Sequence, residues 1–544
     1  MGVSSIDVAL FKKMVINGAI NLKNNQKEVD ELNVFPVPDG DTGTNMSMTI
    51  MSGVRELESF ESSSIIDNAK VLSRGALMGA RGNSGVILSQ FFRGLYVGLK
   101  DIQHDYLDTN DLMVCLDSGC KIAYKAVMEP VEGTILTVVR EAAEKTQAKL
   151  DTFNNVNDLM RCYFEEAKAS LSNTPNLLPV LKEAGVVDSG GAGFCKIIEG
   201  MLMALDGVIL QAKSEMEKKQ QSAAAALDVD IKYGYCTEFI VDLKKPDSFD
   251  EKDIKSGLSL MGDSLVCVRD ENLLKIHVHT NRPGKVLEMA QKYGEFVKLK
   301  IENMRLQHSE LKEGAKEEAP ALQPRKKFAL VSVCFGDGIV STFKDLGVDY
   351  VIEGGQTMNP STEAFVEAIK TVNADNVIII PNNSNVIMAA KQAANMVPHC
   401  NVEVVKAKTI AQGYASIMNF DPEADMETNL AQMTESILHV TSGEITYSIR
   451  DTEIGGIKIN ANDFMGIVDG EIIVSTKEKT DALTHLLEKC ITDESQIVTF
   501  FCGKDVTKSE ISSLENICAS INSDVDVEII EGKQDIYSYI IAVE

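Results

Sequence analysis

Residues 33–46 constrain the fold of this chain more than any other stretch, and they read N-V-F-P-V-P-D-G-D-T-G-T-N-M. Helical patterns precede and follow them. Within the stretch a regular helix is interrupted repeatedly, by Pro36, Pro38, Gly40 and Gly43. The segment is therefore predicted to be a stiff, turning loop between two helices, over about residues 8–30 and 47–57.

Two carboxylates, Asp39 and Asp41, stand two residues apart on this loop. On a turning backbone they can direct their oxygens to one place. Such hard ligands suit Mg²⁺, which takes one or two protein carboxylates and completes its shell with water and phosphate. Thr42, Thr44 and Asn45 add neutral oxygens and amides, so the loop predicts a site for Mg-ATP. The alternative is a plain Asp-Gly turn, which is the commoner explanation of an isolated D-G-D.

A second glycine-rich segment, G-A-R-G-N-S-G at residues 79–85, lies between a helix predicted over 65–78 and an apolar helix predicted to begin near Ser84. A helix N-terminus exposes unpaired N–H groups and the positive end of the helix dipole, so it can bind phosphate. The residues around this helix start are predicted to bind phosphate: Arg81, Gly82, Asn83, Ser84 and Gly85. Asn83 or Ser84 is expected to cap the helix, and Arg81 to add positive charge. The alternative is an ordinary helix–loop–helix corner. The sequence contains neither GxxxxGK[ST] nor GxGxxG, so the common nucleotide-binding folds fit poorly.

Composition excludes several classes of function. The net charge of −27, from 53 basic and 80 acidic residues, argues against general nucleic-acid binding, which depends on neutralising phosphates. The 11 cysteines are scattered and odd in number, which indicates a reducing compartment rather than a disulfide framework. The sequence shows no signal-peptide core and no apolar run long enough to span a bilayer. A cytoplasmic protein is expected, not an integral membrane protein.

The rest of residues 1–205 also has helical patterns, with polar, glycine-rich loops expected at one end. Residues 128–134, M-E-P-V-E-G-T, interrupt one such pattern. Met128 is predicted to border an adenine ring, and Gly133 and Thr134 to start the next helix beside the nucleotide. Asp188 precedes a glycine cluster where a backbone can again approach a ligand. A purely structural loop is an equal alternative for residues 128–134.

A polar linker is predicted at residues 206–228 and a second unit at 229–310, with strand-like runs at 236–243, 264–268 and 274–279. In K-I-H-V-H-T, His277 and His279 alternate with Val278 and so share one side of a strand. With Cys236 they form a ligand set that suits zinc and leaves a fourth position unassigned. The alternative is a polar strand face with an unrelated buried cysteine.

Residues 311–327 form the clearest linker, charged and carrying Pro320 and Pro324. Beyond it, short apolar strands alternate with helical stretches, which indicates βαβ organisation and a parallel sheet. Loops at 336–338, 354–362 and 381–385 are predicted at strand ends, where ligands bind in such folds. The loop at 354–362 is expected to be a docking or active-site loop.

The paired motifs P-V-P-D-G-D-T-G-T-N-M and G-A-R-G-N-S-G-V-I-L-S-Q resemble the nucleotide-binding subunit of dihydroxyacetone kinases. The whole chain resembles the ATP-binding subunit of bacterial fatty acid kinase, through Y-G-Y-C-T-E, K-I-H-V-H-T-N-R-P-G-K-V, G-G-Q-T-M-N-P-S-T and Y-S-I-R-D-T. The first resemblance implies an all-helical barrel in which aspartates on one loop hold two Mg²⁺ ions against ATP. One position departs from the dihydroxyacetone kinases: Val34 stands where they have a third aspartate, and Asn33 is the neighbouring oxygen ligand.

These resemblances imply three domains. They are an all-α nucleotide-binding kinase domain at 1–205, an α+β middle domain with the zinc site at 229–310, and a C-terminal α/β partner-docking domain at 328–544. The last is expected to resemble the fold of the fatty-acid-binding partner. A homodimer is also implied.

The implied function is a kinase that transfers the ATP γ-phosphate to a fatty acid carboxylate presented by a separate fatty-acid-binding protein. The product would be an acyl phosphate for phospholipid synthesis. The implied catalytic residues are Asp39, Asp41 and Arg81, and the implied magnesium ligands are Asn33, Asp39 and Asp41. The implied nucleotide contacts are Thr42, Thr44, Asn45, Gly82, Asn83, Ser84, Gly85, Met128, Gly133, Thr134 and Asp188. The alternatives are a triose kinase of the dihydroxyacetone type and a non-catalytic nucleotide-binding sensor or scaffold.

Overall fold

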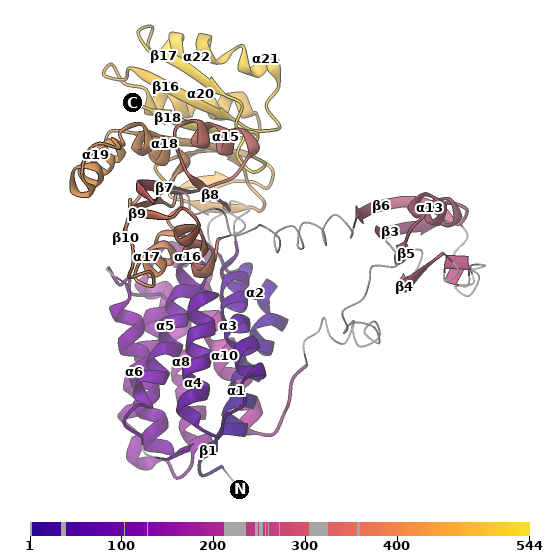
Figure 1. Cartoon of the computed structure of the whole chain (residues 1–544), viewed down its shortest axis with the longest axis vertical. Helices are drawn as coiled ribbons and strands as arrows, with labels where there is room; N and C mark the ends of the chain where they lie inside the picture. Colours follow the sequence, from indigo (N-terminus) through magenta and orange to yellow (C-terminus); the bar gives the residue numbers. More distant parts are fainter. Residues whose placement is uncertain are drawn as a thin grey trace. The chain divides into compact units, whose positions relative to one another are not determined.

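The computed structural model describes residues 3–33, 40–102, 104–127, 129–211, 325–355 and 359–544, and parts of 235–303 (Figure 1). These fall into two compact units. The larger unit combines Met1–Ala212 with Arg325–Glu544, and the smaller unit is Lys213–Pro324. Most of the two predicted linkers, 206–228 and 311–327, lies outside the described residues.

The N-terminal part of the larger unit is helical, as the sequence predicts. Its helices lie side by side in Figure 1, and their bounds are α1 (Val8–Asn24), α2 (Gln26–Asp30), α3 (Thr42–Ser59), α4 (Ile65–Met78), α5 (Gly82–Gly98), α6 (Thr109–Lys125), α7 (Ile135–Gln147), α8 (Val156–Leu177), α9 (Pro179–Ala184) and α10 (Ser189–Leu205). Two short strands, β1 (Ile6–Asp7) and β2 (Tyr106–Leu107), pair before α1 and α6, and a 3₁₀ turn, η1 (Leu150–Thr152), precedes α8.

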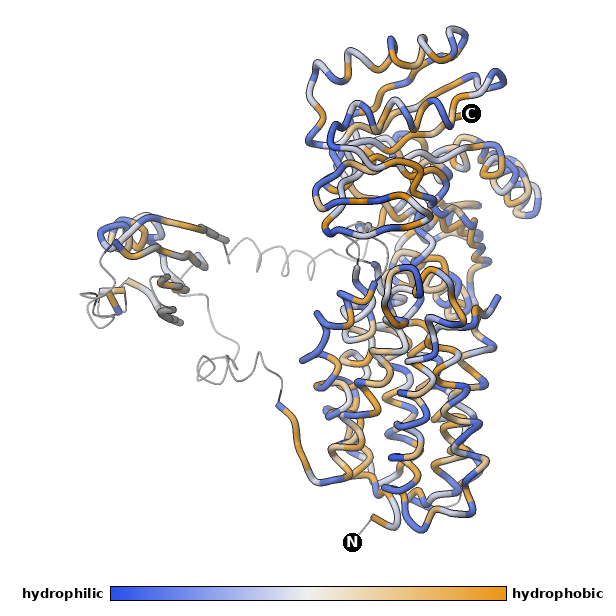
Figure 2. The backbone as a smooth tube through the Cα atoms, turned by 180° about the vertical axis from the view of Figure 1, so that it is seen from behind, coloured by the Kyte–Doolittle hydropathy of each residue, from blue (hydrophilic) through white to orange (hydrophobic). Residues whose placement is uncertain are grey.

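Each long helix buries one apolar face in a common core, and apolar and polar stretches alternate along the helices in Figure 2. The aromatic centre of this core includes Phe91 and Phe194, whose rings meet edge to face at 5.0 Å. Helices α5 and α6 approach closely through Gly94 and Gly119, because a Cβ on Gly94 would lie 2.4 Å from the Gly119 Cα. The glycines therefore set the helix spacing.

Helix direction gathers four N-termini at one end of this bundle. Gly82, at the start of α5, lies against the Asn45 side chain in the first turn of α3. Gly193 of α10 lies against Met46 of α3, and Gly190 of α10 lies against Ile135, the first residue of α7. The starts of α3, α5, α7 and α10 are therefore neighbours, as expected for loops that form a binding end.

The C-terminal part of the larger unit begins with a parallel sheet in the order β10-β9-β7-β8. This confirms the βαβ pattern of the sequence. The elements are β7 (Lys326–Cys334), α15 (Asp337–Asp345), β8 (Tyr350–Glu353), α16 (Thr362–Thr371), β9 (Ala374–Ile380), α17 (Ile387–Ala394), β10 (Asn401–Val404), α18 (Ile410–Met418) and α19 (Met426–Leu438).

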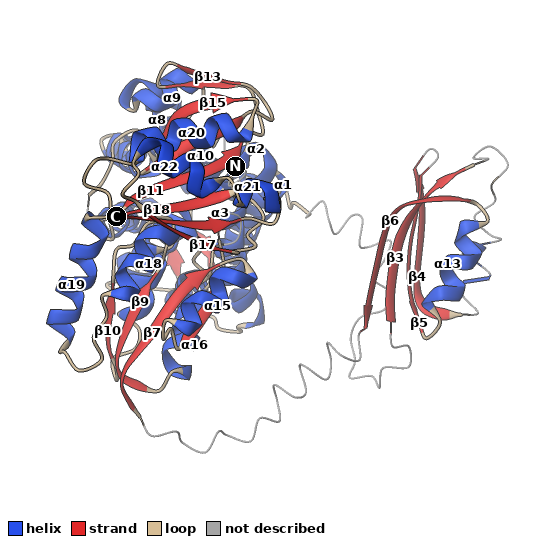
Figure 3. Ribbon diagram, turned by 90° about the horizontal axis from the view of Figure 1, so that it is seen from above, coloured by secondary structure: helices blue, strands red, loops and turns tan. Residues whose placement is uncertain are grey.

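A second, six-stranded sheet follows, in the order β15-β14-β11-β18-β16-β17. It is antiparallel except for the pair β16–β17, and α20 and α22 overlie it in Figure 3. Its elements are β11 (Thr441–Tyr447), β14 (Phe464–Val468), β15 (Glu471–Thr476), α20 (Lys479–Cys490), β16 (Ile497–Cys502), α21 (Lys508–Ile511), α22 (Leu514–Ile521), β17 (Asp526–Ile530) and β18 (Tyr539–Val543). A hairpin of β12 (Thr452–Ile454) and β13 (Ile457–Ile459) lies between β11 and β14 in the sequence.

The smaller unit contains an antiparallel sheet in the order β4-β5-β3-β6. Its described elements are β3 (Tyr235–Leu243), β4 (Gly262–Asp270), β5 (Leu273–Thr280), α13 (Pro283–Gln291) and β6 (Gly294–Asn303). Figure 3 shows α13 along one face of the sheet, and its core includes Phe239, Ile276 and Val286. The strands agree with the predicted α+β composition.

Candidate functional site

The predicted loops line a cavity of about 560 Å³ in the larger unit. From the helical part it is lined by Asn33, Asp41, Thr42, Asn45, Asn83 and Ser84. Its other wall comes from the C-terminal part, through Asn383, Ser384, Asn385, Lys408, Thr409, Gln412, Glu444, Ile467, Asp469, Gly470 and Tyr537. The structure therefore brings the two predicted loops together and adds a second wall that the sequence motifs did not reveal.

Helix α3 begins at this cavity without a cap from its own N-cap residue. Asp41 occupies the N-cap position, but within the described residues its carboxylate makes no capping hydrogen bond to the helix. By contrast, the starts of α1, α4, α6, α8 and α10 are each capped by the side chain of their N-cap residue. A carboxylate in this position supplies hard oxygens of the kind that Mg²⁺ takes as ligands.

Thr44 does not face the cavity, which corrects its predicted role in binding phosphate within the conformation described. Its hydroxyl donates to Asp30 Oδ2 at 2.9 Å and accepts from Gln26 Nε2 at 2.6 Å, and its backbone N–H donates to Asp30 Oδ1 at 3.0 Å. Burial raises the pKa of the Asp30 carboxyl above its ordinary value, although the hydrogen bonds from Thr44 and Gly43 oppose this. Asp30 thus anchors the first turn of α3 to the end of α2.

Helix α5 begins at Gly82, two residues before the predicted start, with Arg81 at the N-cap position and no side-chain cap. Neither Asn83 nor Ser84 caps the helix as predicted, because both lie inside its first turn and line the cavity. Gly82 has φ +58°, and a Cβ there would lie 2.7 Å from Asn45 Nδ2. Glycine therefore allows the starts of α5 and α3 to meet.

Gly85 serves packing rather than the cavity wall. A Cβ on Gly85 would lie 2.4 Å from the Thr49 hydroxyl of α3. Thr49 in turn accepts a hydrogen bond from the Arg81 backbone N–H at 3.3 Å. Both contacts hold the α5 start against α3.

Asn359 links Asp41 to the C-terminal part. Asp41 lies on the loop predicted over residues 33–46 to bind magnesium, called the metal loop below. Its Nδ2 donates to Asp41 Oδ2 at 2.7 Å, and its backbone carbonyl accepts from Arg81 Nη1 at 2.8 Å. Asn359 is 1% exposed. Burial, followed by the charge of Arg55, lowers the pKa of the Arg81 guanidinium. Arg81 therefore holds the segment that carries Asn359, whereas the sequence motifs suggested a catalytic role for it.

Further polar contacts cross between the helical and C-terminal parts. Arg450 donates from Nη1 to the Glu31 carbonyl at 3.1 Å and from Nη2 to the Asn33 carbonyl. Asn83 Nδ2 donates to Asn385 Oδ1 at 3.3 Å. These contacts fix residues on both predicted loops to the same neighbouring wall.

Asp188 caps α10, so it is a structural residue here. Its Oδ2 accepts from the Gly191 N–H at 2.7 Å. Burial raises the pKa of Asp188 to about 6, and hydrogen bonds from the backbone of Gly191 and Ile135 oppose that rise. It does not appear among the residues that line the described cavity.

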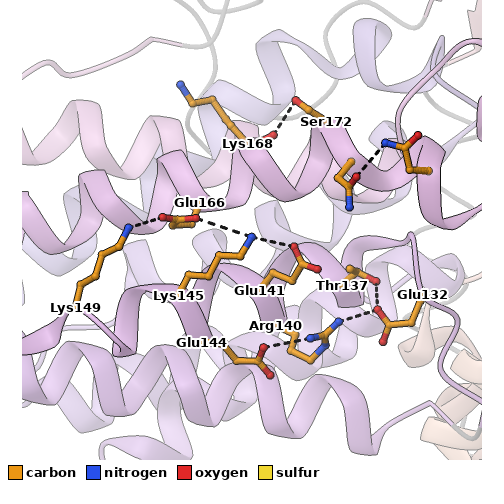
Figure 4. Close-up of polar contacts among 12 residues, drawn as sticks. Glu132, Thr137, Arg140, Glu141, Glu144, Lys145, Lys149, Glu166, Lys168 and Ser172 are labelled. Carbon is orange, nitrogen blue, oxygen red and sulfur yellow. Dashed lines mark hydrogen bonds and ion pairs between the residues drawn. The ribbon is translucent and has the colours of Figure 1, made fainter.

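The loop before α7 is held by a polar network, shown in Figure 4. Glu132 Oε2 accepts from the Thr137 hydroxyl at 2.7 Å and pairs with Arg140 at 2.8 Å. The Gly133 N–H donates to Thr137 Oγ1, and the Thr134 hydroxyl donates to the Val131 carbonyl, so both are engaged within the loop. They are not among the described cavity's lining residues.

Several predicted residues cannot be placed. Asp39 and Met128 lie outside the described residues. The backbone register sets Cys236 opposite His279 on the paired strands β3 and β5, but the side chains of Cys236, His277 and His279 lie outside the described part. Among side chains that are described, no group of three or more His, Cys, Asp or Glu forms a metal site.

Sequence reasoning missed Asp30, Asn359 and Arg450 as neighbours of the metal loop. The signals were present in part, because Asn359 lies in the loop 354–362 that was predicted to be a docking or active-site loop. Arg450 lies in the motif Y-S-I-R-D-T. What the sequence could not supply is that these segments meet Asp41 and Asn33.

The donor set suits a magnesium–phosphate ligand. The start of α5 has no side-chain cap and presents its first backbone N–H groups to phosphate oxygens, whereas the N–H groups of Gly43 and Thr44 in α3 are bound by Asp30. Asp41 supplies a hard oxygen, and Asn83 Oδ1 is buried without a hydrogen-bond partner in the described structure. Lys408 adds a cation on the opposite wall.

Comparisons with known proteins agree with this chemistry. Residues 36–203 match the DAK2 domain family. Residues 232–311 match the middle-domain family of FakA-like fatty acid kinase proteins, and residues 329–544 match the C-terminal family of the same proteins. In the described residues, no helix combines the length and apolarity needed to cross a bilayer.

Full-length relatives are also similar. Protein YloV of Bacillus subtilis is 45% identical over 559 residues, and uncharacterized protein SAR1202 of Staphylococcus aureus is 44% identical over 554; each alignment covers 100% of both chains. Among solved structures, dihydroxyacetone kinase from C. freundii in complex with AMP-PNP and Mg²⁺ is 17% identical, with a TM-score of 0.29, over 37% of this chain and 35% of that one. DegV family protein Cg2579 from Corynebacterium glutamicum is 14% identical, with a TM-score of 0.31, and the alignment covers 40% of this chain and 98% of that one. Both scores are too low to establish a shared fold.

Proposed function

The chain belongs to the FakA-like fatty acid kinase family, with a DAK2 domain typical of kinases, and we propose that it phosphorylates a fatty acid carboxylate at the expense of Mg-ATP. One observation carries the proposal. Asp41, at the start of α3, and the uncapped N-terminus of α5 meet at one cavity of about 560 Å³. A carboxylate for the metal and open N–H groups for phosphate are what a phosphoryl-transfer site requires.

In this proposal Asp39 and Asp41, with Asn33, would hold magnesium, which would neutralise charge on the phosphates. The start of α5 at residues 82–85, with Thr42 and Asn45 of α3, would bind the phosphates. Met128, Gly133, Thr134 and Asp188 remain proposals for the nucleoside end. ATP and two magnesium ions are the proposed cofactors.

The acceptor is a fatty acid carboxylate, which is ionised at pH 7 and needs no strong base. A carboxylate oxygen attacks the γ-phosphorus, the bond from that phosphorus to the β-bridging oxygen breaks, and ADP leaves with the electron pair. The product is an acyl phosphate, proposed to feed phospholipid synthesis. The chain's own residues orient the phosphates and exclude water.

We propose that a separate fatty-acid-binding protein presents the acyl chain, and the match to a family of fatty acid kinase subunits supports a second component. The same proposal includes four further points. They are a C-terminal part that resembles the partner's fold, a barrel form of the helical part, a homodimer and a cytoplasmic location. A triose kinase is the alternative for the acceptor, and a sensor is the alternative without transfer.

Zinc at Cys236, His277 and His279 also stays a proposal. The register of β3 and β5, which sets Cys236 opposite His279, supports it. Elemental analysis of the purified chain is expected to find one zinc per chain in Cys162→Ser but not in Cys236→Ser. Equal zinc contents in the two variants would contradict the assignment.

The activity is tested by mixing the chain with Mg-ATP, a long-chain fatty acid and a fatty-acid-binding protein from the same cell, and trapping acyl phosphate with hydroxylamine. Trapped product is expected only with all components. Asp41→Asn should reduce it by at least about 100-fold, because the metal loses a charged ligand. Asp117→Asn, which alters an exposed carboxylate on α6, is the matched control and should retain activity. ATP consumption with dihydroxyacetone alone would indicate a triose kinase instead.

A further inference from the structure

The segment 359–362 of the C-terminal part lies directly on the start of α5. The Thr362 backbone N–H donates to the Ala80 carbonyl at 3.1 Å. Three residues earlier, the Asn359 carbonyl accepts from Arg81 Nη1 at 2.8 Å. Successive backbone contacts therefore hold the Asn359 side chain at a fixed place beside the helix start.

From that place Asn359 reaches Asp41. Only the amide nitrogen of Asn359 can donate to the Asp41 carboxylate, so the 2.7 Å contact fixes which end of the amide faces Asp41. The other end, Oδ1, is buried without a hydrogen-bond partner in the described structure. Burying an unpaired acceptor costs free energy. In this conformation Asn359 keeps its hydrogen bond to Asp41 although its own Oδ1 stays unpaired.

We propose that Asn359 is a positioning residue which orients the Asp41 carboxylate for magnesium, so that the C-terminal α/β part is a component of the nucleotide site. The proposal rests on the proposed Mg-ATP site and does not require the fatty acid acceptor. A donor held in place by backbone contacts fixes Oδ2 of Asp41, and with it the orientation of the carboxylate that would take the cation.

The obvious alternative is that Asn359 only fastens the two parts of the larger unit together. Gln392 provides a matched control for that role. Its Nε2 donates to the Leu77 carbonyl at 2.9 Å and to the Thr362 hydroxyl at 3.3 Å, and its Oε1 accepts from Gln90 at 3.1 Å. It therefore spans the same boundary and also contacts the segment that carries Asn359, but it does not touch Asp41. A variant of Gln392 should weaken docking alone.

The experiment measures binding of a non-hydrolysable ATP analogue to the full chain by calorimetry over a series of Mg²⁺ concentrations. Asn359→Ala removes the contact with Asp41 and keeps the backbone carbonyl that Arg81 binds. It is expected to raise the Mg²⁺ concentration for half-maximal binding on the order of tenfold, the effect of losing one charge-assisted hydrogen bond. At saturating Mg²⁺ the affinity of Asn359→Ala for the analogue should recover to within about threefold of the affinity of the unaltered chain. Gln392→Ala should leave the Mg²⁺ concentration for half-maximal binding, here called the Mg²⁺ midpoint, unchanged.

An unchanged Mg²⁺ midpoint in Asn359→Ala would overturn the proposal, and so would an equal shift in Gln392→Ala, which would assign the effect to docking. Absence of Mg²⁺-dependent binding in the unaltered chain would overturn both this proposal and the proposed nucleotide site. If the Asn359→Ala shift occurs while no acyl phosphate forms in the hydroxylamine assay, the positioning role stands and the proposed acceptor falls.

Discussion

Thr44 is oriented by a neighbour that lies outside its own sequence motif. Its position on a loop with Asp41 predicted a phosphate ligand, but its hydroxyl and backbone N–H are both bound to Asp30 of the preceding helix. Thr42 and Asn45, from the same motif, do line the cavity. Sequence patterns locate a polar loop well, whereas the direction of each side chain depends on a neighbour that the pattern does not contain.

Asp188 gives a prediction for pH dependence. Burial raises the pKa of its carboxyl in the folded chain to about 6, above its ordinary value of 3.8. Between those values the folded state binds more protons than the unfolded state, so the contribution of Asp188 to stability falls as pH rises through that window. Asp188→Asn does not titrate but keeps an oxygen that can accept from the Gly191 N–H.

The stability of Asp188→Asn relative to the unaltered chain is therefore expected to rise by roughly 1 kcal/mol from pH 5.5 to 7.5. The measurement compares the thermal unfolding midpoints of the two proteins at several pH values in this range. Parallel curves would show that the pKa of Asp188 is not raised in the folded chain.

At the scale of elements, the helix starts were predicted better than their caps. The sequence places a phosphate-binding helix start near residues 82–85, and α5 begins there. The predicted caps were wrong because Gly82, with φ +58°, starts the helix earlier and carries Asn83 and Ser84 into its first turn. The identity of a capping residue depends on one backbone angle, which composition does not reveal.

Gly82→Ala tests this geometry. Alanine at φ +58° is strained, and its Cβ would lie 2.7 Å from Asn45 Nδ2. The variant is expected to lower the thermal unfolding midpoint and to weaken binding of the ATP analogue, by about tenfold or more.

Gly207→Ala is the matched control, because Gly207 also has positive φ, at +81°, but no atom lies within 4 Å of a Cβ there. Gly207→Ala should lower the thermal unfolding midpoint through backbone strain but should not weaken binding of the ATP analogue. Equal nucleotide affinities for the two variants would contradict the proposed close approach of α5 to α3 at the site.

At the scale of the whole molecule, the sequence indicated a helical N-terminal part and a C-terminal part with a parallel sheet, and the structure has both. The sequence did not reveal that the N-terminal and C-terminal parts belong to one compact unit. The contacts that join them, such as Arg450 to the carbonyls of Glu31 and Asn33, bridge residues that are 419 and 417 positions apart. No local pattern encodes such a pairing.

Arg450 provides a prediction at this scale. Its guanidinium is partly buried, which lowers its pKa, and it holds the backbone that leads into the metal loop. Arg450→Ala is expected to leave the carbonyls of Glu31 and Asn33 without this donor. Hydrogen–deuterium exchange at residues 40–45 should then increase, and the Mg²⁺ midpoint for binding the ATP analogue should rise severalfold.

Lys533→Ala is the matched control, because it removes a cation from the same C-terminal part at an exposed position away from the cavity. It should leave both the exchange and the midpoint unchanged. Unaltered exchange at residues 40–45 in Arg450→Ala would show that Arg450 does not hold the loop.

Isotope transfer shows whether a fatty acid carboxylate oxygen attacks the γ-phosphorus of ATP. The full reaction is run with a fatty acid labelled with ¹⁸O in its carboxylate, and the acyl phosphate is cleaved with hydroxylamine, which attacks the carbonyl carbon. The released phosphate is then analysed by mass spectrometry. We predict one ¹⁸O atom in each phosphate released from acyl phosphate, dependent on Asp41, whereas phosphate without ¹⁸O would show that the carboxylate is not the acceptor.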